Sequence, residues 1–293
     1  MNVLSAERLV FSGGGLRGIA YLGALLAIRD RLNVEICDLP NLKQVSGCSI
    51  GSFVALLICM KFTVLEMQSF MHNLNLSKMF EISYESIVST FAMNDASVLT
   101  QMVVDALAVK GLSPTTTFFD LKKKYVLDLL VGATDLTDAK FELLSYKNYP
   151  SMPIVTAVVA SMSLPPVFPP QKFNMKLLSD GGLMNSFPIA LFPVENTLGF
   201  KLAWYVDAAS PKENILTYYT RVLQCLQVPM ETSTASYKVF HIDVGNFSAF
   251  RVDSSSIHEN VVRMMLNGYR QVNLQLDSET QVVPDPCKFL RSA

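Results

Sequence analysis

The stretch LKQVSGCSIGSF, residues 42–53, decides the fold. Its first five residues suit a strand, and an apolar helix is expected from about Ile50. Between them, Gly47, Ser49 and Gly51 form the pattern G-x-S-x-G. In this context the serine sits on a strained turn with its hydroxyl exposed, and the following helix N-terminus favours developing negative charge. The pattern predicts a nucleophile; a glycine-rich turn with an N-capping serine is the alternative.

A second strand–turn–helix unit lies upstream, in VFSGGGLRGIAYLGAL, residues 10–25. A strand is expected over residues 8–12 and a helix from about Leu16. Glycines lie between them in the pattern G-x-G-x-x-G, at Gly13, Gly15 and Gly18. Such a turn exposes backbone N–H groups at a helix N-terminus and suits an anion, which is either a pyrophosphate or a catalytic oxyanion.

The two units together favour the oxyanion. The dinucleotide interpretation expects an acidic residue about 20 positions on, and Glu35 and Asp38 keep it open. A tight turn that binds no ligand is a separate alternative. The dinucleotide interpretation leaves Ser49 without a role. An acyl-transfer enzyme needs both parts, because its nucleophile generates an oxyanion that backbone donors must stabilise. The donors are then expected at Gly13, Gly14 and Gly15.

A third motif, LLSDGGLMNSFP over residues 177–188, supplies a base. Asp180 ends a short expected strand, and Gly181 and Gly182 follow it. A carboxylate in this turn can accept the serine proton if burial raises its pKa from about 4. An ordinary Asp-Gly turn is the alternative.

Strand-like and helix-like segments alternate along the chain, which predicts an α/β fold with a three-layer α/β/α core and a mainly parallel sheet. Residues 61–117 are expected to be mainly helical, and a proline-rich loop covers 164–173. Further strands are expected at 126–133, 140–145, 176–179, 200–206 and 239–244, and further helices at 151–161, 211–228 and 257–276.

Composition narrows the class of protein. Half of the 293 residues are hydrophobic and 17% are charged, yet no apolar run approaches the roughly 20 residues that span a bilayer. The net charge of −1 argues against a nucleic-acid partner, and no cleavable signal peptide is evident. Five scattered cysteines without metal-ligand spacing predict reduced thiols in an intracellular protein, cytoplasmic or peripheral on membranes.

The motifs GGGLRG, GCSIG and DGG, in this order, closely resemble those of the patatin-like phospholipase family. Ala160-Ser161 and the proline-rich stretch through Pro170 resemble the segment that precedes the family's D-G-G/A. The resemblance covers about residues 8–195, the expected catalytic domain; residues 196–293 are expected to form a C-terminal extension packing on the same core.

The resemblance implies a catalytic dyad of Ser49 as nucleophile and Asp180 as general base, with an oxyanion hole from the glycines at 13–15. It also implies hydrolysis of acyl esters of phospholipids or related lipids, of the phospholipase A or lysophospholipase kind. No metal and no cofactor is expected. The expected partners are an acyl-lipid substrate and a membrane surface.

Other assignments stay open. His241 follows Asp180 near an expected strand end and could complete a Ser-His-Asp triad; His72 and His258 are weaker candidates. Arg17 is a candidate for supporting the oxyanion loop or an anionic head group, and equally for a structural ion pair. Lys122–Lys124 could meet anionic lipid, although a solvated face is favoured. A catalytically inactive lipid-binding module is the non-enzymatic alternative.

Overall fold

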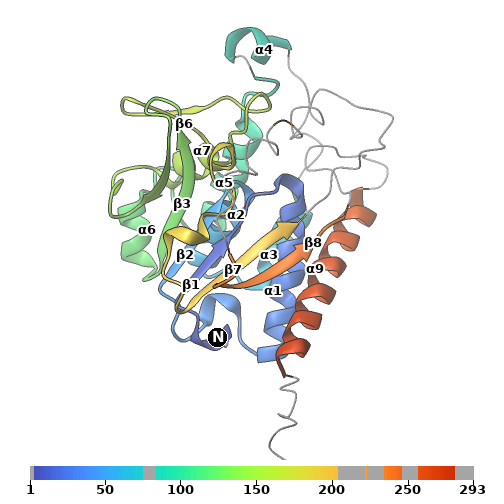
Figure 1. Cartoon of the computed structure of the whole chain (residues 1–293). Helices are drawn as coiled ribbons and strands as arrows, with labels where there is room; N and C mark the ends of the chain where they lie inside the picture. Colours follow the sequence, from blue (N-terminus) through green and yellow to red (C-terminus); the bar gives the residue numbers. More distant parts are fainter. Residues whose placement is uncertain are drawn as a thin grey trace, which may run out of the picture.

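An eight-stranded sheet organises the protein, in the order β5-β6-β3-β2-β1-β7-β8 with β4 paired to β3 (Figure 1). The computed structural model describes residues 3–74, 84–90, 92–203, 222, 234–245 and 257–280. The strands are β1 (Arg8–Phe11), β2 (Gln44–Cys48), β3 (Asp128–Asp135), β4 (Lys140–Ser145), β5 (Gln171–Phe173), β6 (Lys176–Asp180), β7 (Thr197–Ala203) and β8 (Lys238–Asp243).

Helices connect the strands and cover the sheet. The α-helices are α1 (Ile19–Leu32), α2 (Ile50–Cys59), α3 (Val64–His72), α4 (Tyr84–Thr90), α5 (Ser97–Val109), α6 (Phe118–Lys124), α7 (Ile154–Met162) and α9 (Ile257–Thr280). The 3₁₀-helices are η1 (Val3–Ser5), η2 (Gly15–Gly18), η3 (Ile36–Asp38), η5 (Gly181–Leu183) and η6 (Pro188–Leu191).

The mostly parallel α/β sheet that the sequence predicts is confirmed. The pairs β1–β2, β2–β3, β1–β7 and β7–β8 are parallel, whereas β4, β5 and β6 pair antiparallel. Some details differ: β5 falls within the expected proline-rich loop, and β7 begins at Thr197 rather than Phe200. Strand β3 and helix α7 begin two and three residues later than expected, at Asp128 and Ile154. The helix expected over 211–228 lies outside the described residues, except for residue 222.

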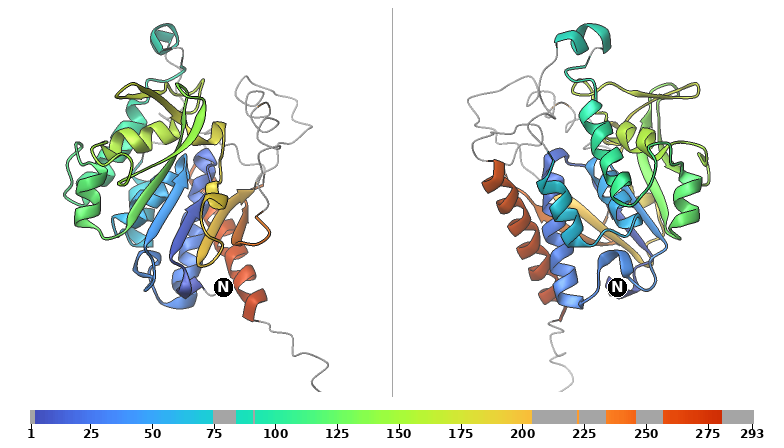
Figure 2. Two further views of the ribbon diagram at one scale, coloured as in Figure 1. Left: turned by 60° about the vertical axis from the view of Figure 1, so that its left-hand side comes forward. Right: turned by 180° about the vertical axis from the view of Figure 1, so that it is seen from behind.

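The two faces of the sheet are covered unequally. Alternate strand residues such as Leu9 and Phe11 join the large core cluster, to which α1, α2, α5, α7 and α9 contribute. Figure 2 shows these helices together when the molecule is seen from behind. Val10 points the other way, because successive side chains of a strand alternate between faces, and packs with Phe187, Ile189 and other residues around η6.

Helix α9 packs closely along α1 (Figure 1). A Cβ added at Gly23 of α1 would lie 1.8 Å from the Met265 carbonyl oxygen, and one added at Gly268 of α9 would lie 2.0 Å from that of Ala20. The two glycines therefore allow backbone-to-backbone contact that a side chain would prevent.

Two glutamines of α9 bind the edge of β8 that pairs with no described strand. The side-chain amide of Gln271 accepts from the backbone N–H of Asp243 (2.7 Å) and donates to its carbonyl (2.5 Å). Gln275, one turn later, makes the same pair of bonds with His241 (3.0 and 2.8 Å). The helix thus satisfies backbone groups of alternate residues that face away from β7.

Among the described residues, no helix is both long enough and apolar enough to cross a membrane. Cys37, Cys48 and Cys59 are buried free thiols. Cys225 and Cys287 lie outside the described residues.

Candidate active site

Ser49 occupies the tight turn between β2 and α2. Its backbone has φ 53° and ψ −130°, a left-handed conformation that costs about 1–3 kcal/mol for a residue with a side chain. The Ser49 carbonyl accepts bonds from the backbone N–H (2.9 Å) and the hydroxyl (2.6 Å) of Ser52. The turn is therefore held by the first residues of the helix that follows it.

The motif glycines allow the two strand–turn–helix units to meet. A Cβ added at Gly51 would lie 2.5 Å from the Ser12 carbonyl oxygen at the end of β1, and one added at Gly47 would lie 2.0 Å from the Gly51 carbonyl oxygen. Side chains at these positions would push α2 away from β1. The spacing of the glycines thus reflects a close approach of backbones as well as the turn itself.

Asp180 faces the serine. The Ser49 hydroxyl donates to Oδ2 of Asp180 at 2.7 Å, and the Gly182 backbone N–H donates to Oδ1 at 2.7 Å. Asp180 is only 3% exposed. Burial raises the pKa of its carboxyl to about 7, although the bonds from Ser49 and Gly182 act in the opposite direction. A carboxyl with this pKa can take up and release a proton near neutral pH.

The sheet brings Ser49 and Asp180 to the same level. Strand β3 lies between β2 and β6, and its Gly132 pairs with Cys48 while its Ala133 pairs with Asp180. Since Ser49 directly follows Cys48, the two side chains meet across one intervening strand. The approach is close, because a Cβ added at Gly181 would lie 2.6 Å from the Gly132 carbonyl oxygen.

The glycine-rich loop lies beside the serine. A Cβ added at Gly13 would be 3.2 Å from Cβ of Ser49. The Gly13 N–H donates to the Ser186 carbonyl at 2.9 Å, so of the three donors expected from the sequence this one is already used. No hydrogen bond from the amides of Gly14 or Gly15 to any described residue is found.

The base of this loop is fixed by a buried tyrosine. The Tyr21 hydroxyl donates to the Ser12 carbonyl (2.7 Å), and the backbone N–H of Leu202 on β7 donates to the Ser12 hydroxyl (3.0 Å). Arg17 follows the loop in η2 and is 5% exposed. Burial lowers the pKa of its guanidinium to about 10, which leaves it charged at neutral pH.

His241 lies far from the serine. It is on β8, separated from β2 by β1 and β7, which corresponds to roughly 14 Å at the usual strand spacing. Burial, with a contribution from Lys201, lowers the pKa of its imidazole. His72 ends α3 and His258 lies in the first turn of α9, where its side chain is outside the described set. The sheet order therefore keeps His241 away from Ser49.

The lysines at 122–124 end α6. The Lys122 ammonium donates to the Val126 carbonyl and pairs with Asp128 at 2.7 Å, and that of Lys124 donates to the Lys110 carbonyl at 2.7 Å. These contacts favour a structural role for Lys122 and Lys124 over contact with anionic lipid.

Ser161 also touches the site. Its hydroxyl, at the end of α7, accepts from the Ser49 backbone N–H at 2.9 Å and donates to the Gly132 carbonyl at 2.6 Å. The sequence indicates Ser161 only through the segment that precedes D-G-G. Its contact with the serine joins residues 112 positions apart, and no local pattern reports such a contact.

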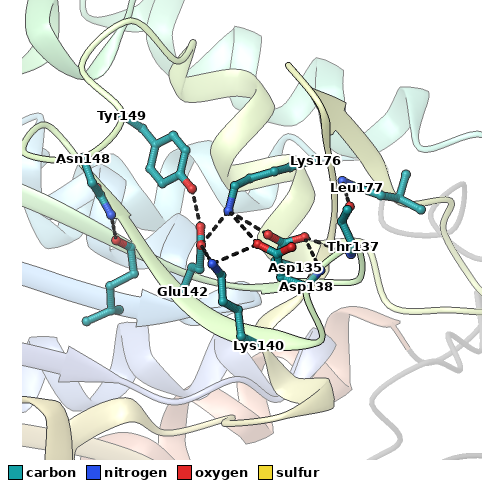
Figure 3. Close-up of polar contacts among 10 residues, drawn as sticks. Asp135, Thr137, Asp138, Lys140, Glu142, Asn148, Tyr149, Lys176 and Leu177 are labelled. Carbon is teal, nitrogen blue, oxygen red and sulfur yellow. Dashed lines mark hydrogen bonds and ion pairs between the residues drawn. The ribbon is translucent and has the colours of Figure 1, made fainter.

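A second buried aspartate, Asp135, takes part in a network of ion pairs and hydrogen bonds (Figure 3). Asp135, at the end of β3, is paired with Lys176 of β6 at 2.7 Å, and Lys176 also contacts Glu142 of β4 at 2.6 Å. The Tyr149 hydroxyl donates to Glu142, and the backbone N–H of Thr137 donates to Asp135 at 2.9 Å. This network joins β3, β4 and β6 at the end of β6 opposite Asp180.

Comparisons with known proteins agree with the geometry. The family model described as patatin-like phospholipase matches residues 9–193. Curated relatives include uncharacterized protein R571 of Acanthamoeba polyphaga mimivirus, 29% identical over 202 residues, covering 67% of this chain and 65% of that protein. Probable lipid hydrolase 463L of Invertebrate iridescent virus 6 is 27% identical over 188 residues, covering 62% of each chain. The chain thus spans less than two thirds of the length of both relatives.

Solved structures share the fold. VipD from Legionella pneumophila superposes with a TM-score of 0.63 at 16% identity, over 94% of this chain and 67% of that one. ExoU, in its complex with SpcU from Pseudomonas aeruginosa, gives a TM-score of 0.55 at 16% identity, over 95% of this chain and 52% of that one. With its glycine loop, serine turn and D-G-G in one site, and a family model matched over most of its length, the chain belongs to the patatin-like phospholipase family.

Proposed function

We propose that the protein hydrolyses fatty-acyl esters of lipids, with Ser49 as nucleophile and Asp180 as general base. The observation that carries the proposal is the 2.7 Å bond from the Ser49 hydroxyl to a buried carboxyl whose pKa is about 7. Such a base is substantially ionised at neutral pH and still binds a proton well. Family membership, and the description of the iridescent virus relative as a probable lipid hydrolase, support an acyl lipid as substrate.

The reaction has two halves. Ser49 Oγ attacks the carbonyl carbon of the ester, and its proton passes to Asp180. The bond from that carbon to the alcohol oxygen then breaks, Asp180 returns the proton to the leaving oxygen, and the acyl group remains on Ser49. Water attacks the acyl-enzyme in the same way, which releases the fatty acid and restores both residues.

The oxyanion that forms in each half is assigned to the amides of Gly14 and Gly15. Gly13 is left out because its N–H is bonded to Ser186. Donors fixed in place before the reaction stabilise charge without having to reorganise, which is the main contribution of such a site. The anchoring of Ser12 by Tyr21 and β7 supports this fixed arrangement.

We also propose that the protein makes peripheral contact with a lipid surface, which the proposed acyl-lipid substrate supports. We also propose that residues 196–293 extend the catalytic domain of residues 8–195 and pack on the same core. Two facts support this: every residue of β1 pairs with β7, from Arg8 opposite Thr197 to Phe11 opposite Phe200, and α9 packs closely on α1.

The test is covalent labelling with a fluorophosphonate probe, together with release of labelled fatty acid from phosphatidylcholine vesicles. Wild type is expected to be labelled and active, and Ser49→Ala neither. Ser46→Ala is the matched control. It removes a buried hydroxyl from the same strand, and that hydroxyl has no hydrogen-bond partner among the described residues. A folded wild type that is neither labelled nor active would instead support the lipid-binding module.

The same assay tests for a metal requirement. We expect turnover to persist in excess chelator, because every proton transfer and charge in the proposed steps is assigned to protein groups. Loss of activity with chelator, restored by calcium, would contradict this mechanism.

A further inference from the structure

The Ser161 hydroxyl makes two bonds whose directions are fixed by chemistry. The Ser49 backbone N–H can only donate, and the Gly132 carbonyl can only accept. The single hydrogen of the Ser161 hydroxyl is therefore directed to Gly132, at 2.6 Å, and its lone pair to Ser49, at 2.9 Å. Ser161 is fully buried, so water does not compete for either bond.

These bonds act on the strained residue itself. Ser49 has φ 53°, and such a conformation persists only when its surroundings hold it. Its carbonyl is held by Ser52, and its amide is held by Ser161. The second partner of Ser161, Gly132, lies on the strand between the serine and the aspartate. Ser161 thus ties the serine turn to the strand over which the two side chains meet.

We propose that Ser161 is a positioning residue, which holds the backbone of Ser49 so that the Ser49 hydroxyl meets Asp180 and the Ser49 amide is kept out of the oxyanion hole. The inference rests on the proposed function of Ser49. Without the Ser161 hydroxyl, the amide loses its partner and the turn is free to relax toward an unstrained conformation. The hydroxyl then spends less time at 2.7 Å from the carboxylate, and attack on the ester becomes slower.

Ser163 provides a matched control. It is the same residue type, two positions on and fully buried, and its hydroxyl donates to the Val159 carbonyl at 2.8 Å. Its backbone carbonyl accepts from the Asp180 amide, and alanine retains that carbonyl. Ser161→Ala and Ser163→Ala each remove one buried hydroxyl, and only the first removes a partner of Ser49.

The experiment measures kcat, KM, the pH dependence of kcat/KM and the rate of fluorophosphonate labelling for wild type and both variants. For Ser161→Ala we expect kcat and labelling to fall about 10- to 100-fold, the scale of a small misplacement of reacting groups, with KM changed less than about threefold. In the pH profile of kcat/KM, the acid-side midpoint should also move to higher pH. The reason is that a weaker bond from Ser49 lowers the pKa of Asp180 less. Ser163→Ala should change kcat less than about threefold and leave the acid-side midpoint of the pH profile unchanged.

Equal kcat and equal pH midpoints in the two variants would overturn the inference. If Ser161→Ala does not fold, Ser161→Cys takes its place, because a thiol keeps a weak donor and acceptor. A kcat below that of wild type, together with a shifted acid-side midpoint of the pH profile, then supports the positioning role of Ser161. Wild-type values of both would overturn it. Failure of the proposed function is recognised separately, as a wild type that the probe does not label.

Discussion

Asp135 and Asp180 lie on paired strands two residue pairs apart, and both are buried, with 0% and 3% exposure. Their carboxyl groups nevertheless have opposite pKa shifts. Burial acts to raise the pKa of Asp135, but Lys176 and backbone N–H groups outweigh it, so that the pKa lies below its usual value. Asp180 receives bonds from a hydroxyl and one amide, and burial raises its pKa to about 7.

The difference teaches that burial alone does not make a base. A buried carboxylate beside a cation remains ionised and holds strands together, as Asp135 does in Figure 3. A buried carboxylate bonded only to neutral donors binds a proton near neutral pH, which is what the proposed attack by Ser49 requires.

Removing the Asp180 carboxylate should abolish turnover. We expect Asp180→Asn, Ser49→Ala and the double variant to lose activity by a similar factor, on the order of 10³ or more, because residues that act as one unit show non-additive losses. Steady-state hydrolysis of a labelled ester measures this. Asp135→Asn is the control. It should affect stability rather than chemistry, and a comparable loss of kcat in a folded Asp135→Asn would contradict the division of roles.

The free energy of unfolding should depend on pH through Asp180. In the folded state its carboxyl keeps a proton up to about pH 7, whereas the unfolded chain releases it near pH 4. Between these values the folded state binds more protons, so stability falls as pH rises, by up to roughly 1.4 kcal/mol per pH unit. Urea unfolding at pH 4.5, 6 and 8 should show this fall in wild type and a flatter dependence in Asp180→Asn. Parallel curves for the two proteins would indicate that Asp180 keeps an ordinary pKa.

Breaking the Lys176 network should destabilise the fold. Lys176→Met leaves Asp135 buried without its cation, and we expect a loss of about 1–3 kcal/mol, the cost of an unsatisfied buried polar group. Lys140→Met is the matched control. Lys140 contacts Asp138 and Glu142 but is half exposed, so its loss should cost less than about 1 kcal/mol. Thermal melts compare the two, and equal losses would argue against the importance of burial at Asp135.

Removing the His241 imidazole should have the smallest effect. His241→Gln is expected to change kcat/KM less than about tenfold, because positioning and packing effects fall short of proton transfer. Since Asp180 itself has a pKa of about 7, a rising activity limb near neutral pH does not by itself indicate a histidine. Persistence of that limb in His241→Gln would assign it to the carboxyl. A folded variant as inactive as Ser49→Ala would restore the triad.

Local patterns predict the parts of this protein that depend on neighbouring residues. G-x-S-x-G between a strand and a helix correctly places Ser49 on the turn between β2 and α2. Alternating strand and helix segments correctly give the mostly parallel sheet. The short strand β5 was missed because it lies beside prolines, and its pairing with β6 depends on contacts that a local window does not contain.

Contacts between distant segments account for the rest of the site. Sequence spacing could not show that Ser186 occupies the Gly13 amide or that Ser161 holds Ser49. Nor could it show why the pKa values of the two buried aspartates shift in opposite directions, since Lys176 lies 41 positions from Asp135 along the chain. These facts depend on which strands become neighbours, and that order is set by the whole core.

The glutamines of α9 affect how readily the sheet of one molecule can pair with that of another. Among the residues that the structure describes, β8 is the last strand of the sheet. An exposed edge strand is a template on which another chain can add a strand and begin to aggregate. Gln271 and Gln275 occupy both the donors and the acceptors of Asp243 and His241. An approaching chain therefore has to displace two side-chain amides, each bonded at two points, before it can extend the sheet. By covering this edge, α9 helps to keep the molecule from joining its copies strand to strand.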